Sequence, residues 1–236
     1  SIMAVTFTNK AAREMQARIG KLVDASSAKS LWMGTFHSVF AKILRIEAER
    51  LGYPTNFTIY DADDSKKLIS TIIKEKQLDK DIYKAKSVSS RISSLKNNLL
   101  TPKAYFQNGE LQAQDSAAKM PMFGEIYQAY AERCFRAGAM DFDDLLLKTN
   151  ELLYKFPEVL AKYQNRFKYI LVDEYQDTNH SQYLIVKALA AKYENICIVG
   201  DDAQSIYAFR GANIRNILNF QKDYPNTQLF KLEQNY

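Results

Sequence analysis

The chain contains several short, uninterrupted apolar runs, each ending in a polar or small residue. The runs IMAVTF, SLWMG, YILV and ICIV lead into Thr8, Thr35, Asp173 and Gly200, and TQLFKL near the carboxyl end is a fifth. Continuous apolarity, as opposed to alternation, is typical of strands that are covered on both faces, as in a parallel sheet. The segments between the runs have helical spacing, at residues 10–22, 37–50, 180–191 and 213–222. This alternation predicts an α/β domain with a parallel sheet.

Residues 51–140 have a different pattern. They hold no comparable strand run, are rich in Lys, Ser, Gln and Asn, and show amphipathic helical spacing over 62–77 and 119–136. The α/β pattern resumes at MDFDDLLLKT, where Asp141 is placed to cap a helix. We therefore predict that a helical insertion interrupts the α/β domain. The predicted parts are residues 1–50 and 141–236 for the two halves of the α/β domain and residues 51–140 for the insertion.

The charge of the chain is moderately basic. A net charge of +5 and an isoelectric point near 9.0 mildly favour a polyanionic partner. The excess is uneven, because residues 1–50 hold eight Lys or Arg against four Asp or Glu, whereas residues 141–236 hold 11 against 13. A solvated surface explains such an excess as well as a binding groove does.

The cysteine and histidine content excludes several classes of protein. Cys134 and Cys197 lie far apart and form no metal-binding pattern, and Cys197 stands in an apolar run, so that we expect a buried thiol and a reducing compartment. Two histidines are too few for a histidine-built zinc site. No stretch has the pattern of a signal peptide or the length of a membrane span. We expect a cytoplasmic protein without a membrane partner.

Two adjacent carboxylates, Asp173 and Glu174, follow the run YILV. A carboxylate at a strand end can hold Mg²⁺, which prefers oxygen ligands and keeps several waters. A second carboxylate beside it can deprotonate the water that attacks a phosphoryl group. The alternative is that Asp173 caps the next turn and Glu174 is a solvated neighbour, and the pair alone does not decide between the two.

A second polar cluster, VGDDAQSIYAFRGA, follows the run ICI. Gln204 can sense a terminal phosphate through its amide. Tyr207 and Phe209 can stack unpaired bases while Arg210 meets a phosphate. The alternative places both rings in the core and pairs Arg210 with a neighbouring aspartate, and by itself this alternative is favoured.

The amino-terminal runs end in residues that suit contact with nucleic acid. Phe7 is a possible stacking ring, and Thr8 and Asn9 are possible donors to a backbone phosphate. Thr35 and His37 stand at a helix start, where backbone N–H groups attract anions. Capping of the two helices explains Thr8, Asn9 and Thr35 equally well.

Six blocks occur together in this chain: TFTNKAAREM, GTFHS, MDFDDLL, LVDEYQDTN, VGDDAQSIYAFRGA and LEQNY. In order and approximate spacing they resemble the UvrD/Rep/PcrA family of superfamily 1 DNA helicases. The resemblance covers almost the whole chain and is weakest over 51–140. It implies a RecA-like motor domain (1A) interrupted by a helical subdomain (1B), with ATP and Mg²⁺ as cofactors. It also implies 3′–5′ movement on single-stranded DNA and unwinding at duplex junctions, in DNA repair or replication.

The resemblance also implies roles for individual residues. Asp173 would be the Mg²⁺ carboxylate, Glu174 the base for water attack, and Gln204 the contact that couples the γ-phosphate to the DNA site. The implied DNA contacts are Phe7, Tyr207 and Phe209 at base pockets, with Thr8, Asn9, Thr35, His37 and Arg210 along the DNA path.

One expected element is missing from the sequence. None of the eight glycines belongs to a G-x-x-x-x-G-K-[ST] phosphate loop. In the family this Walker A loop precedes the TFTN block, while an arginine and the second motor domain follow the NY at Tyr236. We therefore expect part of a longer helicase that alone neither hydrolyses ATP nor unwinds DNA.

Two other functions stay open. One is a non-catalytic module that binds single-stranded nucleic acid or docks a partner. The other is a metal-dependent nuclease built on Asp173 and Glu174 with Asp201 and Asp202, which leaves the aromatic and glutamine positions unexplained.

Overall fold

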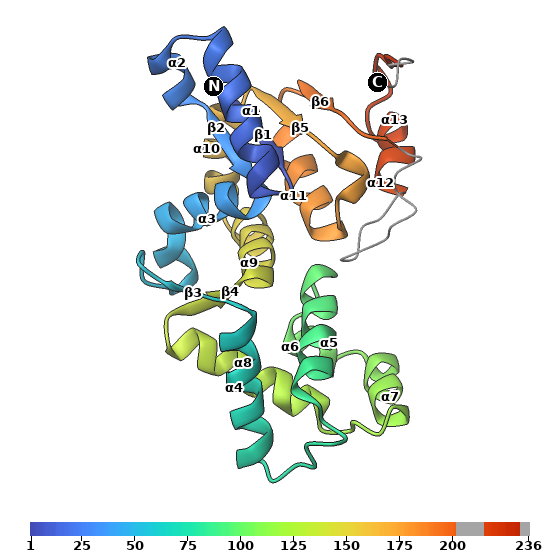
Figure 1. Cartoon of the computed structure of the whole chain (residues 1–236). Helices are drawn as coiled ribbons and strands as arrows, with labels where there is room; N and C mark the ends of the chain where they lie inside the picture. Colours follow the sequence, from blue (N-terminus) through green and yellow to red (C-terminus); the bar gives the residue numbers. More distant parts are fainter. Residues whose placement is uncertain (202–214, 232–236) are drawn as a thin grey trace.

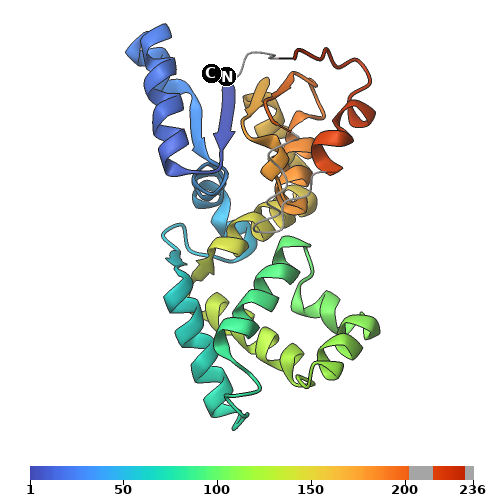
Figure 2. The same ribbon diagram turned by 45° about the vertical axis from the view of Figure 1, so that its right-hand side comes forward.

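The computed structural model describes residues 1–201 and 215–231. A sheet with its helices lies at one end of the molecule and a group of helices lies at the other (Figures 1 and 2). The main sheet has four parallel strands in the order β2-β1-β5-β6. Their bounds are Ile2–Thr6 for β1, Trp32–Thr35 for β2, Tyr169–Val172 for β5 and Ile196–Ile198 for β6. The predicted α/β class with a parallel sheet is confirmed.

Helices follow the strands of this sheet, and three of them were predicted from spacing. These are α1 (Asn9–Leu22), α3 (Phe36–Glu47) and α11 (His180–Ala190). Asp141 caps α9 through a capping box, as predicted. The remaining elements here are α2 (Ala25–Ser30), η1 (Ala48–Leu51), α9 (Phe142–Lys155), α10 (Pro157–Arg166), η2 (Tyr175–Asp177), α12 (Arg215–Leu218) and α13 (Phe220–Asp223). In the described part of the chain, no helix combines the length and apolarity that crossing a bilayer requires.

The two faces of the main sheet differ in what covers them. Met3, Val5 and Ile170 point to one face, where they join a core built with α3, α9, α10 and α11. On the other face Ala4 is 2% exposed, and Ala12 of α1 is also buried. Alternate residues of β1 therefore face two different layers of helices, as the period of two requires.

A second core lies among the helices at the other end of the molecule. The chain enters this region through β3 (Thr58–Tyr60) and leaves it through β4 (Ala139–Asp141), which pair in parallel. The buried residues of the helices between them form a cluster of their own, separate from the core under the sheet. The helices are α4 (Ala62–Glu75), α5 (Ala85–Asn97), α6 (Pro102–Phe106), α7 (Gly109–Ala117) and α8 (Phe123–Arg136).

Two predictions about strands are wrong. Strands β3 and β4 flank the helical group, where no strand was expected, because two three-residue strands are too short to leave an apolar run in the sequence. The run TQLFKL forms no strand over residues 227–231, and Leu229 and Phe230 are 66% and 80% exposed. A strand forms only where a neighbouring strand satisfies its backbone, and none of the described strands pairs with this segment.

The expectation that every strand is covered on both faces is also wrong. Tyr169, Leu171 and Val199 are 54%, 40% and 54% exposed, and Cys197, which was expected to be buried, is exposed. These residues follow the outward alternation of β5 and β6. Helix α1 packs beside β2 and β1 (Figure 1), so that no described helix covers the β5–β6 half of this face.

Candidate nucleotide and nucleic-acid site

The carboxyl ends of the parallel strands meet at one edge of the sheet. From β1 the chain moves to β2 on one side, and it later returns to β5 on the other side of β1. The direction of winding therefore reverses between β1 and β5. Open α/β sheets bind ligands in the crevice beyond such a reversal. Asp173 is held there, because its backbone N–H donates to the carbonyl of Val5 at 3.0 Å.

The two predicted catalytic carboxylates differ in their backbone geometry. Asp173 and Glu174 are both half-buried, and the Asp173 carboxylate accepts a hydrogen bond from the Glu174 N–H at 3.0 Å. Glu174 has φ 53° and ψ 43°, in the left-handed region that non-glycine residues seldom adopt. Such strain costs about 1–3 kcal/mol and gathers at functional sites. Glu174 is one of five described non-glycine residues with a positive φ, and it is the one among them that the sequence pattern selects.

Gln176 connects this pair to the end of the neighbouring strand. Its side chain is 2% exposed, and its Nε2 donates to Oε2 of Glu174 at 2.6 Å. Its Oε1 accepts from the backbone N–H of Asp201 at 3.1 Å. Gln176 therefore fixes the carboxylate of Glu174 relative to the segment after β6. The sequence analysis missed this residue, although it lies in the quoted block LVDEYQDTN.

The polar residues after β1 and β2 act as helix caps. Thr8 Oγ1 accepts from the N–H of Ala11 at 3.1 Å, and Thr35 Oγ1 accepts from the N–H of Ser38 at 3.2 Å. The capping alternative is therefore correct for both threonines. It does not exclude a ligand contact, because a hydroxyl that accepts one hydrogen bond retains its proton to donate. Asn9, the first residue of α1, is exposed at the same edge.

Aromatic rings lie near these caps. Phe7 is half-buried and its ring centroid is 5.1 Å from that of Phe36. The His37 ring lies 5.9 Å from the ring of Phe142, which is 50% exposed at the start of α9. An exposed phenylalanine beside a histidine is a ready surface for stacking. Phe142 was missed by the sequence analysis, and its position in the quoted block MDFDDLL was the available signal.

One buried polar atom is left without a partner among the described residues. Thr6 is 1% exposed, and its Oγ1 has no hydrogen bond. Thr6 pairs with Thr35 across the β1–β2 ladder, one residue before Phe7. Buried hydroxyls are nearly always satisfied, so that a partner from outside the described residues is the expected explanation.

The other predicted site residues, Gln204, Tyr207, Phe209 and Arg210, lie outside the described residues.

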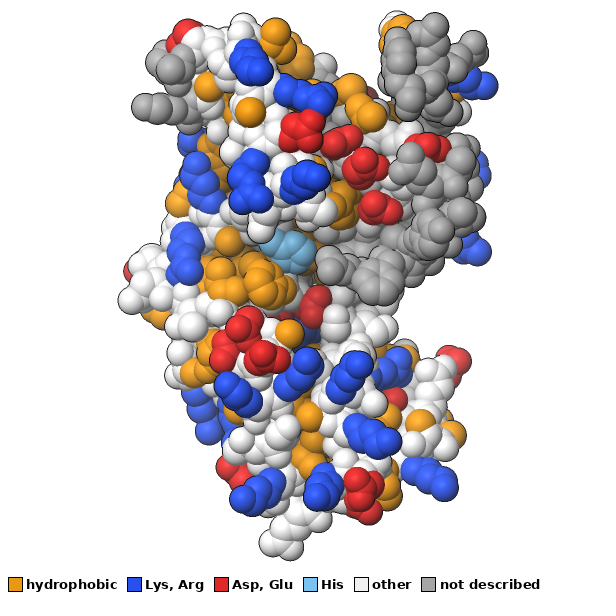
Figure 3. Space-filling model, viewed as in Figure 1, with side chains coloured by type: hydrophobic (Ala, Val, Ile, Leu, Met, Phe, Trp, Pro, Cys, Tyr) orange, Lys and Arg blue, Asp and Glu red, His pale blue; other side chains and the backbone are white. Residues whose placement is uncertain are grey.

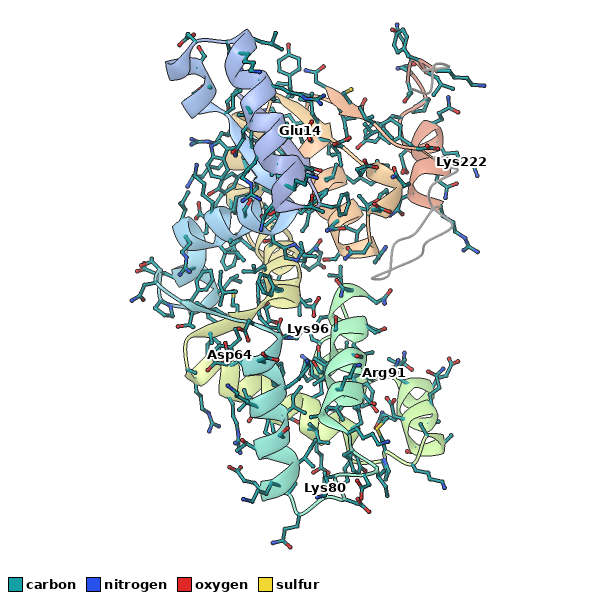
Figure 4. All side chains as sticks on the ribbon, viewed as in Figure 1. Glu14, Asp64, Lys80, Arg91, Lys96 and Lys222 are labelled. Carbon is teal, nitrogen blue, oxygen red and sulfur yellow. The ribbon has the colours of Figure 1, made fainter. Side chains whose placement is uncertain are left out.

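A buried lysine joins the helical group to the start of α9. Lys96 of α5, labelled in Figure 4, is 2% exposed, and its Nζ lies 2.8 Å from carboxylate oxygens of both Asp141 and Asp144. Tyr130 of α8 also donates to Asp141, at 2.8 Å. Burial disfavours the charge on Lys96, but the two carboxylates outweigh it and hold the lysine pKa well above its ordinary value. Burial raises the pKa of Asp144 to about 6.

Asn97 extends this junction toward the carboxylate pair. Its Nδ2 donates to Asp143 at 2.9 Å, and its Oδ1 accepts from Nδ2 of Asn179 at 2.9 Å. Asn179 caps α11, five residues after Glu174. The helical group is therefore hydrogen-bonded to the segment that begins with the predicted catalytic residues.

The carboxylates of this edge suit one kind of metal site. No cluster of three or more His, Cys, Asp or Glu residues able to hold a metal occurs in residues 1–201 and 215–231. Mg²⁺ is commonly bound by one or two carboxylates together with waters and substrate phosphates. Asp173 fits that arrangement.

Comparison with known proteins identifies the class. The chain belongs to the family of UvrD/REP helicase N-terminal domains, which matches residues 1–225. Among individual relatives, it is 47% identical to the ATP-dependent DNA helicase PcrA of Staphylococcus aureus strain Mu50 over 236 residues. It is 46% identical to the protein of the same name from Staphylococcus epidermidis strain ATCC 12228. The match covers 100% of this chain and 31% of each relative, so that the chain spans about a third of their length.

Proposed function

We propose that the full-length protein with this sequence is an ATP-dependent DNA helicase that moves 3′ to 5′ on single-stranded DNA. The observation that carries the proposal is the switch-point edge, where the carboxylates Asp173 and Glu174 stand beside the capped helix starts at Thr8 and Thr35. Membership in the UvrD/REP family and relatives that carry the name of an ATP-dependent DNA helicase support it.

The nucleotide half of the site uses the carboxylate pair. Asp173 holds Mg²⁺, which supplies charge neutralisation for the phosphates of ATP. Glu174 takes the proton from the attacking water, and the hydrogen bond from Gln176 keeps its carboxylate oriented. Gln204 contacts the γ-phosphate and couples it to the DNA site.

The DNA half of the site lies over the ends of β1 and β2. Thr8, Asn9 and Thr35 donate to backbone phosphates, and His37 lies on the same path. The rings that stack unpaired bases are those of Phe7, Tyr207 and Phe209. Phe142 joins them because its ring is exposed beside His37. Arg210 contacts a phosphate.

The domain organisation that we propose follows the two cores. Residues 1–50 and 141–236 form the RecA-like domain 1A, and residues 51–140 form the helical subdomain 1B inserted into it. The separate core of α4–α8 and the β3–β4 pair at its entrance and exit support this division.

The phosphate-binding loop and the second motor domain come from the remainder of the parent protein. The absence of the loop motif from the sequence and the greater length of the relatives support this. We therefore propose that the 236-residue chain alone does not turn over ATP.

Single-turnover and steady-state ATP hydrolysis by the full-length protein, with and without single-stranded DNA, tests the proposal. Glu174→Gln should lower DNA-stimulated hydrolysis by about 10²–10⁴-fold, the usual contribution of a general base. Glu194→Gln is the matched control, because Glu194 also has a left-handed backbone (φ 52°) but is exposed before β6.

Duplexes with a 3′ or a 5′ single-stranded tail test the direction, and only the 3′-tailed substrate should be unwound. ATP hydrolysis by the full-length protein that does not depend on DNA and is unaffected by Glu174→Gln would overturn the proposed helicase function. ATP turnover by the 236-residue chain that Glu174→Gln abolishes would overturn the proposed inactivity alone.

A further inference from the structure

A groove of about 400 Å³ lies on the side of the sheet away from the carboxylate pair. It is bordered by α1, by the edge strand β2 and by α3. Its volume is within the range of pockets that hold a small ligand. The groove ends at Asn9 and Thr35, which belong both to its lining and to the DNA contacts proposed above.

The charged side chains of the groove are cationic. Arg13 of α1 and Lys42 of α3 both line it and both are exposed. No carboxylate of the described residues pairs with Arg13, and the neighbouring Glu14 pairs with Arg18 of the same helix at 2.5 Å. Lys and Arg side chains gather over α1 and α3 in the space-filling view (Figure 3).

The lysine of the groove is held in place by an aromatic ring. Lys42 Nζ lies 4.1 Å from the ring centroid of Trp32, whose side chain is 3% exposed. A cation over an indole face loses part of its freedom before any ligand arrives, so that binding costs less ordering entropy.

We infer that this groove holds the phosphodiester backbone of single-stranded DNA as the strand leaves Thr8 and Thr35. The inference rests on the proposed function, and it assigns to Arg13 and Lys42 one phosphate contact each. The ligand is the backbone and not the bases, because Trp32 is covered and no other aromatic side chain lines the groove. The Gln16 side chain, which also lines the groove, is assigned no phosphate contact, because its Nε2 already donates to the carbonyl of Met33 at 3.1 Å.

The test measures binding of the full-length protein to fluorescent oligo(dT) across a range of salt concentrations. Each phosphate contact to a single strand adds about 0.7 to the slope of log K against log [salt]. The variant Arg13→Gln/Lys42→Gln should therefore reduce the slope by about 1.4. The control Lys168→Gln/Lys192→Gln makes the same charge change at the amino ends of β5 and β6, where both lysines are exposed.

A second variant, Arg13→Lys/Lys42→Arg, keeps both charges and should retain the wild-type slope, which separates loss of charge from damage to the fold. An unchanged slope in the Gln double variant, or an equal reduction in the control, would overturn the inference while wild-type DNA binding upholds the proposed function. An acidic peptide that competes for this groove without displacing DNA would overturn it too. Failure of the wild-type protein to bind oligo(dT) at all would refute the proposed function itself.

Discussion

Replacement of Lys96 by methionine tests whether the buried charge cluster holds the two parts of the molecule together. Lys96 contacts Asp141 and Asp144 at 2.8 Å each, and all three side chains are at most 10% exposed. Removal of one partner from a buried ion pair leaves an uncompensated charge and costs about 3–5 kcal/mol. We expect Lys96→Met to lower the free energy of unfolding by that amount at pH 7.5.

Lys148→Met is the matched control. Lys148 pairs with Glu151 of the same helix at 2.7 Å, but the two side chains are 22% and 23% exposed. Solvent screens such a pair, so that its loss should cost less than about 1 kcal/mol. Urea unfolding of the two variants and the wild-type chain, followed by tryptophan fluorescence, measures both values.

The cost of Lys96→Met should also depend on pH. In the variant the two carboxyls can become neutral by taking up protons, so that the penalty shrinks as the pH falls toward 4. In the wild type, the raised pKa of Lys96 means that its stabilisation is present throughout neutral pH and is lost only above the ordinary lysine range. A Lys96→Met cost within 1 kcal/mol of the Lys148→Met cost, or one that is equal at pH 4 and pH 7.5, would refute the buried-charge argument.

Three further perturbations test the packing and the titration of the same chain. Gly124→Ala should cost about 1–3 kcal/mol in urea unfolding, because its Cβ would lie 2.6 Å from a tyrosine ring carbon of α6, whereas Gly20→Ala, with nothing within 4 Å, should not destabilise. Cys197 should react quickly with a thiol reagent and Cys134 only on unfolding, since Cys134 is buried and its pKa is raised to about 12 by that burial; equal rates would contradict this. The folded chain should keep the proton of Asp144 between about pH 4 and 6, after the unfolded chain has lost it, so that this group lowers stability as the pH rises through the window. Asp144→Asn should remove that component, and an unchanged pH slope would count against it.

Local signals in the sequence were sufficient for much of the sheet. Four apolar runs became its four strands, and Asp141 and Thr35 cap helices because a cap depends only on residues three positions away. The pair β3–β4 was missed because it joins residues about 80 apart and leaves no pattern in either segment. The exposed face of β5 and β6 was missed because apolarity shows that a surface prefers to be buried, and not which segment covers it.

The residues of the candidate site also fall into two groups, those found from local sequence signals and those whose contacts are distant in the sequence. Asp173 and Glu174 follow a strand and were found from that fact, whereas the contact of Gln176 is with Asp201, in the segment after β6, 25 residues along the chain. Phe142 becomes a candidate stacking surface only because α9 starts beside His37. Lys96 looks like any helix lysine in sequence, since the charges that hold it come from a segment 45 residues away.

The left-handed conformation of Glu174 links these observations. A strained residue persists only where its surroundings over-determine it. Here the N–H of the next residue, Tyr175, donates to the carbonyl of Val199, directly after β6, at 2.9 Å, and the Glu174 carbonyl accepts from the N–H of Asp177 at 2.9 Å. Gln176 fixes the carboxylate itself at 2.6 Å. These three hydrogen bonds, made by the three residues that follow Glu174, hold it in this conformation. The left-handed backbone alone does not mark Glu174, since exposed Glu194 shares it (φ 52°); the hydrogen bond from buried Gln176 to a half-buried carboxylate is what supports the proposed role of Glu174 as a base.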